Sequence, residues 1–106
     1  MALQLGFALL DACLLSVLGK GDAYGYILTQ NIKEIIDVSE STLYPVLRRM
    51  QKEGLLSTYD KSFNGRNRRY YKITEMGAKK LKEYIRYWME YRAGLDEILL
   101  GGLVEE

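Results

Sequence analysis

Residues 41–74 read STLYPVLRRMQKEGLLSTYDKSFNGRNRRYYKIT and pass from a helical pattern to a hairpin pattern. Leu43, Leu47 and Met50 recur at i, i+4 and i+7, which is the spacing of one buried helix face. Gly54 follows at a point where a glycine commonly ends a helix. We therefore expect a helix that ends at the residue before this glycine.

The start of this helix is open between two positions. Ser39, Ser41 and Thr42 all offer hydroxyl oxygens that can cap a helix N-terminus. Pro45 lacks a backbone N–H and fits most easily in a first turn. Either the helix begins near Ser41, or it begins at Ser39 and tolerates a distortion at the proline.

Two β-prone runs follow, at residues 55–62 and 68–74. Between them lies Asn64-Gly65, and both residues tolerate the positive φ that a tight hairpin turn requires. Tyr70 and Tyr71 are neighbours on the second run, so their side chains point to opposite faces. We expect one of them in the core and the other partly exposed.

The residues before this segment predict two further helices. Residues 7–18 are strongly apolar at helical spacing, and Gly19 and Gly21 end the run. Asp22 has the carboxylate of an N-cap for a second helix at residues 23–36. The stripe that this second helix should bury consists of Leu28, Ile32 and Ile35.

The last predicted helix is too long for the domain that precedes it. It starts after a Thr74 cap and covers residues 75–100, on the order of 40 Å at 1.5 Å per residue. A small domain at residues 1–74 cannot bury the whole of this helix. Apolar residues nevertheless continue along the helix beyond the part that the domain can bury. We therefore assign residues 75–106 as a dimerisation helix and expect a homodimer. The dimerisation seam consists of Leu81, Ile85, Trp88, Leu95 and Leu99.

Charge is distributed unevenly along the chain. The formal net charge is +1, but residues 48–82 contain 11 Lys and Arg against three Asp and Glu. That segment carries +8 and the rest of the chain −7. A basic segment of this kind is typical of a surface that binds a polyanion.

The composition excludes much enzyme chemistry. The 106-residue chain has no His and a single Cys, so it can form neither a Cys/His zinc site nor a His-based triad. We therefore expect no enzyme activity, no cofactor and no metal. Residues 5–18 are too short for a membrane span and are interrupted by Asp11, which predicts a cytoplasmic protein.

Three helices followed by a two-stranded hairpin form the winged helix-turn-helix plan, a mainly α fold with a small β-hairpin (α+β). In this plan the third helix enters the major groove of double-stranded DNA, and the hairpin, or wing, contacts the backbone or the adjacent minor groove. Hydroxyl and aromatic groups can approach base edges, whereas Arg and Lys suit phosphates. The expected DNA-binding residues are Ser39, Ser41, Thr42, Tyr44, Arg48, Arg49, Lys52, Arg66 and Arg68.

Three motifs resemble the PadR family of bacterial transcription regulators: GDAYGYILTQNIKE (21–34), SESTLYPVLRRMQKEGLL (39–56) and GRNRRYYKITEMG (65–77). The resemblance covers residues 9–100 and includes one C-terminal helix with Trp88, as in the small subfamily. It implies a homodimeric repressor that binds a palindromic operator with its third helix and its wing.

Trp88 lies in the middle of the dimerisation seam, where it either anchors the interface or stacks on a planar aromatic effector. The resemblance supports the effector, because some small members of the family bind flat drug-like or phenolic compounds there. Asp11, Ala12 and Ser16 on the first helix are further candidates for this ligand site. Asp11 either pairs with Arg92 across the dimer, lines a pocket that favours cationic guests, or lies at the surface.

The residues leave a second function open, in which the winged helix is a protein-interaction module and its basic face binds an acidic partner. Substitution of Tyr44 and Arg68 distinguishes the two hypotheses. It abolishes DNA binding under the first hypothesis, and under the second the only deficit is in partner binding.

Overall fold

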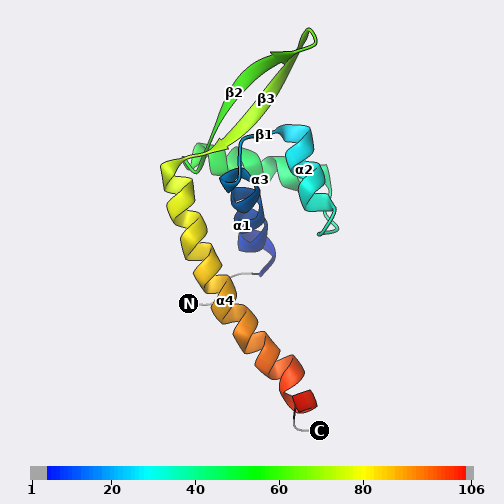
Figure 1. Cartoon of the computed structure of the whole chain (residues 1–106), viewed down its shortest axis with the longest axis vertical. Helices are drawn as coiled ribbons and strands as arrows, with labels where there is room; N and C mark the ends of the chain where they lie inside the picture. The colour runs from blue at the N-terminus through cyan, green and yellow to red at the C-terminus, as the bar shows by residue number, and fades with distance from the viewer. Residues whose placement is uncertain (1–4, 105–106) are drawn as a thin grey trace.

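The computed structural model describes residues 5–104, with side chains described from residue 9 to residue 101. This part of the chain forms four helices and a small antiparallel sheet (Figure 1), which confirms the expected mainly helical winged-helix fold with a C-terminal helix. The elements are α1 (Leu5–Gly19), β1 (Ala23–Tyr24), α2 (Gly25–Lys33), α3 (Glu40–Lys52), β2 (Leu56–Phe63), β3 (Arg66–Ile73) and α4 (Glu75–Val104). Among these helices, none is both long enough and apolar enough to cross a bilayer.

The hairpin forms around the predicted turn. β2 and β3 pair in antiparallel register over their whole length, and Phe63 faces Arg66 at the tip. Asn64 and Gly65 form the two-residue turn, with φ angles of 51° and 77°. Positive φ at both positions is what a tight hairpin turn of this length requires.

The expected second helix starts late, because its first two residues form a strand. β1 pairs with β3 through Ala23↔Tyr71 and Tyr24↔Tyr70, which makes β3 the central strand of the sheet. Tyr71 is buried and Tyr70 is half-buried, as expected for neighbours on a strand. α2 therefore begins at Gly25.

Asp22 does not cap α2, so that prediction was wrong. The N-cap position is Tyr24, which makes no side-chain capping bond. The Oδ2 atom of Asp22 instead accepts a 2.7 Å hydrogen bond from the hydroxyl of Tyr59 on β2. These two residues are 37 positions apart, and only the pairing of β1 and β2 with β3 brings them together.

α2 ends at Lys33 and not at residue 36. Leu28 and Ile32 are buried as predicted, but Ile35 is 85% exposed. The backbone N–H groups of Ile35 and Ile36 both donate to the carbonyl of Ile32, at 3.1 and 2.9 Å. This tightened last turn diverts the chain from the helical path, so Ile35 leaves the predicted stripe.

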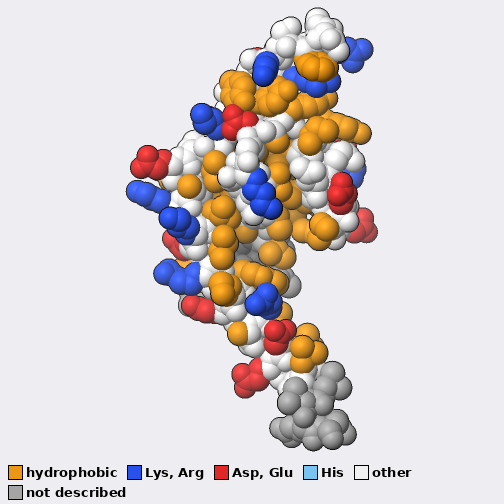
Figure 2. All heavy atoms as spheres, viewed as in Figure 1, with side chains coloured by type: hydrophobic (Ala, Val, Ile, Leu, Met, Phe, Trp, Pro, Cys, Tyr) orange, Lys and Arg blue, Asp and Glu red, His pale blue; other side chains and the backbone are white. Residues whose placement is uncertain are grey.

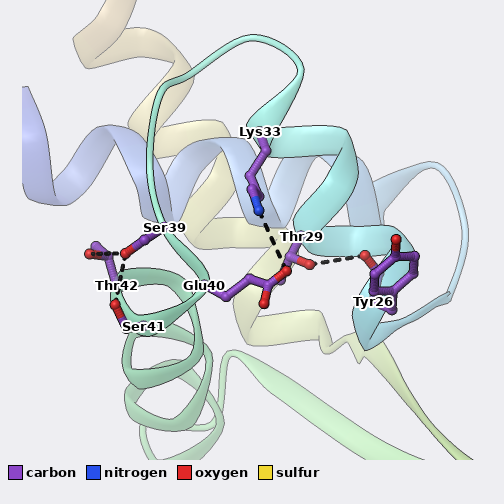
Figure 3. Close-up of polar contacts among 7 residues, drawn as sticks. All are labelled: Tyr26, Thr29, Lys33, Ser39, Glu40, Ser41 and Thr42. Carbon is purple, nitrogen blue, oxygen red and sulfur yellow. Dashed lines mark hydrogen bonds and ion pairs between the residues drawn. The ribbon is translucent and has the colours of Figure 1, made fainter.

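α3 begins at Glu40, between the two expected starts, and Ser39 is its N-cap. Pro45 lies inside the helix and not in its first turn. The Ser39 hydroxyl makes no capping bond to the backbone. It lies 2.8 Å from the hydroxyl of Ser41 and 3.2 Å from that of Thr42, which groups three hydroxyls at this end of α3 (Figure 3).

α3 buries the predicted stripe and ends at Lys52, one residue before the predicted end, with Glu53 as its C-cap. Leu43, Leu47 and Met50 are fully buried. Gly54, at φ +83°, donates its N–H to the carbonyl of Gln51 at 3.1 Å, and the next amide donates to the carbonyl of Met50 at 2.9 Å. These are the two hydrogen bonds of a Schellman cap. The rest of the core consists mainly of Leu14, Leu15, Leu18, Leu28, Ile32, Val46, Leu55, Leu56 and Tyr71.

The first part of α4 packs against the domain, and the later part does not. The Oγ1 atom of Thr74 accepts a 3.0 Å bond from the N–H of Gly77, which confirms the predicted cap. Gly77 is packed so closely against the carbonyl of Leu55 that a Cβ at this position would overlap with it. Leu81 and Tyr84 pack against the core. The remainder of α4 projects away from the domain, and the molecule measures 62 × 26 × 22 Å (Figure 1).

Candidate nucleic-acid interface

The side of α3 that is not buried carries most of the groups expected to contact DNA. Ser41, Thr42, Arg48 and Lys52 are exposed, and Tyr44 is half-buried. The hydroxyls lie at the N-terminal end of the helix, and the cations lie toward its C-terminal end. The two ends of α3 therefore suit base edges and phosphates, respectively.

A groove of about 580 Å³ lies where α3, the start of α2 and the wing (residues 56–73) meet. Tyr44 lines this groove from α3, and Arg66 and Arg68 line it from β3. The structure thus brings together predicted residues from both halves of the expected interface. The other lining residues, which the sequence had not marked as site residues, are Tyr24, Gly25, Tyr26, Asp60, Asn67, Arg69 and Tyr71.

Gly25 allows aromatic rings to approach the start of α2. A Cβ at this position would lie 3.3 Å from the ring of Tyr71 and 3.7 Å from the hydroxyl of Tyr44. Gly25 is itself flanked by Tyr24 and Tyr26, which also line the groove. A glycine between two aromatic residues is a sequence signal for such a close approach, and it could have indicated this part of the site.

Arg68 contacts two aromatic rings. Its Cζ atom lies 4.4 Å from the ring centroid of Tyr24 and 4.1 Å from that of Phe63. Both distances are within cation–π range, and each contact contributes about 0.5–1 kcal/mol at an exposed site. Because Tyr24 belongs to β1 and Phe63 to the tip of β2, the guanidinium ties the outer half of the wing to the rest of the domain.

Three tyrosines form a row across the base of the wing. The register places Tyr24 beside Tyr70 and Tyr70 beside Tyr59. The rings of Tyr59 and Tyr70 stack, with centroids 5.5 Å apart and planes at 9°, and the centroids of Tyr24 and Tyr70 are 6.2 Å apart. The hydrogen bond to Asp22 raises the pKa of Tyr59. Cross-strand aromatic pairs of this kind stabilise a sheet, so the wing has a stiff base.

The wing keeps most of its positive charge. Residues 56–73 contain five Lys and Arg against one acidic residue, Asp60. The Oδ1 atom of Asp60 lies 3.6 Å from Nε of Arg69 across the hairpin. Both side chains are exposed, so this ion pair contributes little to stability. A net charge of +4 therefore remains on the wing, which suits a phosphate backbone.

Arg49 lies apart from the groove, on the side of α3 that faces α1. Its Nη2 atom lies 2.6 Å from Oδ1 of Asp11, and its Nη1 atom lies 2.9 Å from Oε1 of Glu53. Asp11 is 1% exposed, and its Oδ2 atom accepts a 3.3 Å bond from the hydroxyl of Tyr84. The surface position considered for Asp11 was therefore wrong. Its ion-pair partner within the chain is Arg49, because the packing of α1 on α3 brings the two charges together.

The surroundings of Asp11 shift the pKa of both side chains that contact it. Burial, the charge of Asp11 and the hydrogen bond donated to it raise the pKa of Tyr84 to about 12. Burial lowers the pKa of Arg49, but the hydrogen bond to Asp11 and the charge of Asp11 outweigh it, and the pKa is raised overall. At neutral pH the tyrosine is a protonated donor and the arginine is a cation.

The four ligand candidates do not share one site within a single chain. Trp88 is half-buried on α4, and its ring centroid lies 6.4 Å from that of Tyr91. Ser16 lines a separate, apolar pocket of about 230 Å³ between α1 and α2, to which Trp88 does not contribute. Ala12 is half-buried on α1, next to the ion-paired Asp11.

The described residues contain no group of three His, Cys, Asp or Glu side chains that could hold a metal ion. Cys13 is half-buried, and burial raises the pKa of its thiol. A raised pKa keeps the sulfur protonated at neutral pH, so Cys13 lacks the thiolate character of a reactive cysteine.

The model of the transcriptional regulator PadR-like family matches residues 14–83, which is more than half of the chain. The chain belongs to this family. The PadR-like chain is similar in structure to a protein from Streptococcus mutans, with a TM-score of 0.86 and 39% identity over 95% of each chain. It is also similar to a PadR-like transcriptional regulator from Bacillus cereus, with a TM-score of 0.79 and 33% identity over 87% of this chain and 92% of that one.

The same fold occurs in PadR from Bacillus subtilis, whose crystal structure contains operator DNA. The TM-score is 0.66 and the identity 23%, over 73% of this chain and 46% of that one. Membership of the PadR-like family makes this protein a transcription regulator and not an enzyme, which confirms the function class expected from the sequence.

Proposed function

We propose that this PadR-like regulator is a homodimeric repressor that reads a palindromic operator with α3 and the wing. The observation that carries the proposal is the groove in which Tyr44 of α3 lies together with Arg66 and Arg68 of the wing. A helix in the major groove beside a basic hairpin at the flanking backbone is the winged-helix way of binding DNA. The proposed contacts are Ser39, Ser41, Thr42, Tyr44, Arg48, Lys52, Arg66 and Arg68.

The shape and surface of α4 support the homodimer. Its outer part projects from the domain and still carries large apolar side chains: Ile98 is 77% and Leu99 69% exposed. Figure 2 shows hydrophobic side chains gathered down the middle of the visible face and continuing onto α4. Exposed apolar residues on a projecting helix suit contact with a second copy of the same helix. We therefore assign α4 as the dimerisation helix of a cytoplasmic regulator.

We also infer that a planar aromatic effector releases the operator. In a two-fold dimer, a guest stacked on the paired Trp88 rings changes the crossing of the two α4 helices. The two recognition helices must lie roughly 34 Å apart to meet successive major grooves, so this change disturbs operator binding. A coupling of about 1–3 kcal/mol lowers operator affinity about 5- to 150-fold. Ala12 and Ser16 remain candidates for this site, whereas the carboxylate of Asp11 is already ion-paired and buried.

The first experiment is a titration of the protein with its own upstream intergenic DNA, followed by Trp88 fluorescence at two salt concentrations. Random DNA of equal length is the control. Binding that is salt-dependent and that random DNA does not match supports the proposal. Equal binding of both DNAs contradicts it and favours an acidic protein partner for the basic surface.

A second titration tests the effector. Planar aromatic cations are added to the protein–DNA complex, and the expected result is quenching of Trp88 together with release of DNA. The control is Trp88→Leu, whose DNA binding is followed by gel shift because the variant has no tryptophan. It should keep DNA binding and lose the response to the compounds. Release of DNA from this variant at the same concentrations would place the effector elsewhere.

A further inference from the structure

Arg48 and Arg49 are neighbours on α3, but their side chains have different surroundings. Successive helical residues point about 100° apart around the helix axis. Arg48 is exposed. The side chain of Arg49 is 29% exposed and reaches Asp11 on α1. Two arginines that look equivalent in the sequence are therefore not equivalent in the fold.

We propose that Arg49 is a positioning residue and not a DNA contact, and that together with Asp11 and Tyr84 it sets the orientation of α3 for operator reading. We call these three residues the Asp11 cluster. The proposal rests on the DNA-binding function proposed above. It replaces the expectation that Arg49 binds phosphate.

The geometry supports this role, because three helices meet at one carboxylate. One oxygen of Asp11, on α1, is 2.6 Å from the Arg49 guanidinium on α3. The other oxygen accepts a bond from the Tyr84 hydroxyl on α4, at 3.3 Å. The second terminal nitrogen of Arg49 lies 2.9 Å from Glu53, at the C-terminal end of α3. Both terminal nitrogens are therefore within hydrogen-bond distance of carboxylates inside the domain.

Burial makes the cluster hard to rearrange. The Asp11 side chain is 1% exposed, and a buried carboxylate is costly unless it is paired and hydrogen-bonded. Rotation of Arg49 toward DNA would remove the cation from that carboxylate. A charge-assisted hydrogen bond at 2.6 Å also limits how far α3 can slide or tilt on α1.

The cluster also connects the two proposed functional parts of the molecule. Tyr84 lies on α4, the proposed dimerisation helix, four residues before Trp88. Arg49 lies on α3, within the same two turns as Arg48 and Lys52. A displacement of α4 therefore acts on the recognition helix through Tyr84, Asp11 and Arg49, without a change in any DNA-contacting side chain.

The experiment compares four proteins: wild type, Tyr84→Phe, the double variant Asp11→Asn with Arg49→Gln, and Arg48→Gln as the matched control. The double variant replaces the ion pair with two neutral amides, so no buried charge is left without its partner. Tyr84→Phe removes a single hydroxyl and leaves every charge in place. For each protein, affinity is measured for the upstream intergenic DNA and for random DNA at several salt concentrations, and thermal unfolding confirms that it is folded.

The two positions should respond differently. Arg48→Gln should weaken binding to both DNAs and reduce the slope of log affinity against log salt by about 0.9, the value for one lost phosphate contact. The double variant should keep the wild-type salt slope. In both the double variant and Tyr84→Phe, the ratio of specific to random affinity should fall by about 2- to 30-fold, the range for residues that act through others.

Three results would overturn the proposal. A salt slope reduced in the double variant as in Arg48→Gln would make Arg49 a phosphate contact. If both the double variant and Tyr84→Phe are folded and keep the wild-type ratio of specific to random DNA affinity, the Asp11 cluster contributes only to stability. If the wild-type protein binds both DNAs equally, the proposed function itself is wrong, and the role proposed here for Arg49 is wrong as a consequence.

Discussion

The guanidinium carbon of Arg68 lies 4.4 Å from the ring centroid of Tyr24. Arg68 belongs to the wing, and Tyr24 ends the short strand β1. Their contact therefore joins the hairpin to the segment between α1 and α2. The ring centroid of Phe63 lies 4.1 Å from the same carbon. A side chain that is already held in place loses less conformational freedom on binding, so this arrangement prepares Arg68 for a DNA backbone.

Replacing Tyr24 with Leu should weaken DNA binding without removing a charge. Leucine keeps apolar bulk but lacks the ring that attracts the Arg68 guanidinium, a loss of about 0.5–1 kcal/mol. Tyr24→Phe retains the ring and should bind DNA like the wild type. Gel-shift titration of both variants checks the prediction, and equal affinities would show that the ring of Tyr24 does not position Arg68.

Gly77→Ala should destabilise the protein, whereas Gly94→Ala should not. Both glycines lie in α4, but a Cβ at Gly77 would overlap with the carbonyl of Leu55, and a Cβ at Gly94 meets no atom within 4 Å. Overpacking typically costs about 1–3 kcal/mol. An alanine in an open helix position instead gains about 0.5–1 kcal/mol over glycine. Chemical denaturation measures both changes, and a stable Gly77→Ala protein would contradict the close packing of α4 on Leu55.

Tyr84 should contribute to a loss of stability at alkaline pH. Its pKa is about 12 in the folded protein and 10 as an ordinary tyrosine, so folding favours its protonated form. The contribution is fully present below pH 10 and is lost as the pH rises through about 12. Tyr84→Phe should therefore lose less stability than the wild type across this window.

The measurement for Tyr84 is denaturant unfolding at several pH values. The pKa values of Tyr59 and Tyr71 are also raised, but both residues are present in both proteins and cancel in the difference. The same difference between the two proteins at every pH would mean that Tyr84 ionises at an ordinary pKa in the folded state.

Leu99→Gln should weaken the proposed dimer, and Glu97→Gln should leave it intact. Leu99 is 69% exposed in the single chain, and burial of a leucine contributes about 1.5–3 kcal/mol. In a two-fold dimer each substitution counts twice, so dissociation should increase by at least about tenfold. Analytical ultracentrifugation measures the association of both variants. Identical dissociation constants for the two variants would show that the C-terminal end of α4 does not lie in the dimer interface.

The winged-helix fold could be predicted because its main signals are local. The stripe of Leu43, Leu47 and Met50 lies within two helical turns. Asn64-Gly65 forms its turn through its own backbone preferences. The N–H groups of Gly54 and Leu55 close α3 by donating to the carbonyls of Gln51 and Met50. Each of these features depends on neighbours a few positions away, so the sequence alone is sufficient to predict it.

The errors at α2 have the opposite cause. The strand at Ala23–Tyr24 exists because β3 offers it a partner nearly 50 positions later, and Asp22 is drawn to Tyr59 by the same sheet. In the sequence, Asp22 before an expected helix looks like an N-cap whether it caps that helix or bonds to a distant strand. Ile35 continues the helical spacing of Leu28 and Ile32, but this spacing does not show that α2 ends before Ile35.

The sequence by itself determined the recognition helix, the hairpin and the projecting α4, because helical and strand periodicity and turn preferences act over a few residues. Only the tertiary structure decided that Arg49 belongs to Asp11 while Arg48 stays exposed, and that Tyr24 holds Arg68. The physical reason is that the groups packed around a charged or aromatic side chain decide whether it pairs inside the domain or stays exposed. Asp11 and Arg49 are separated by 38 positions in the chain and meet only when α1 and α3 pack together.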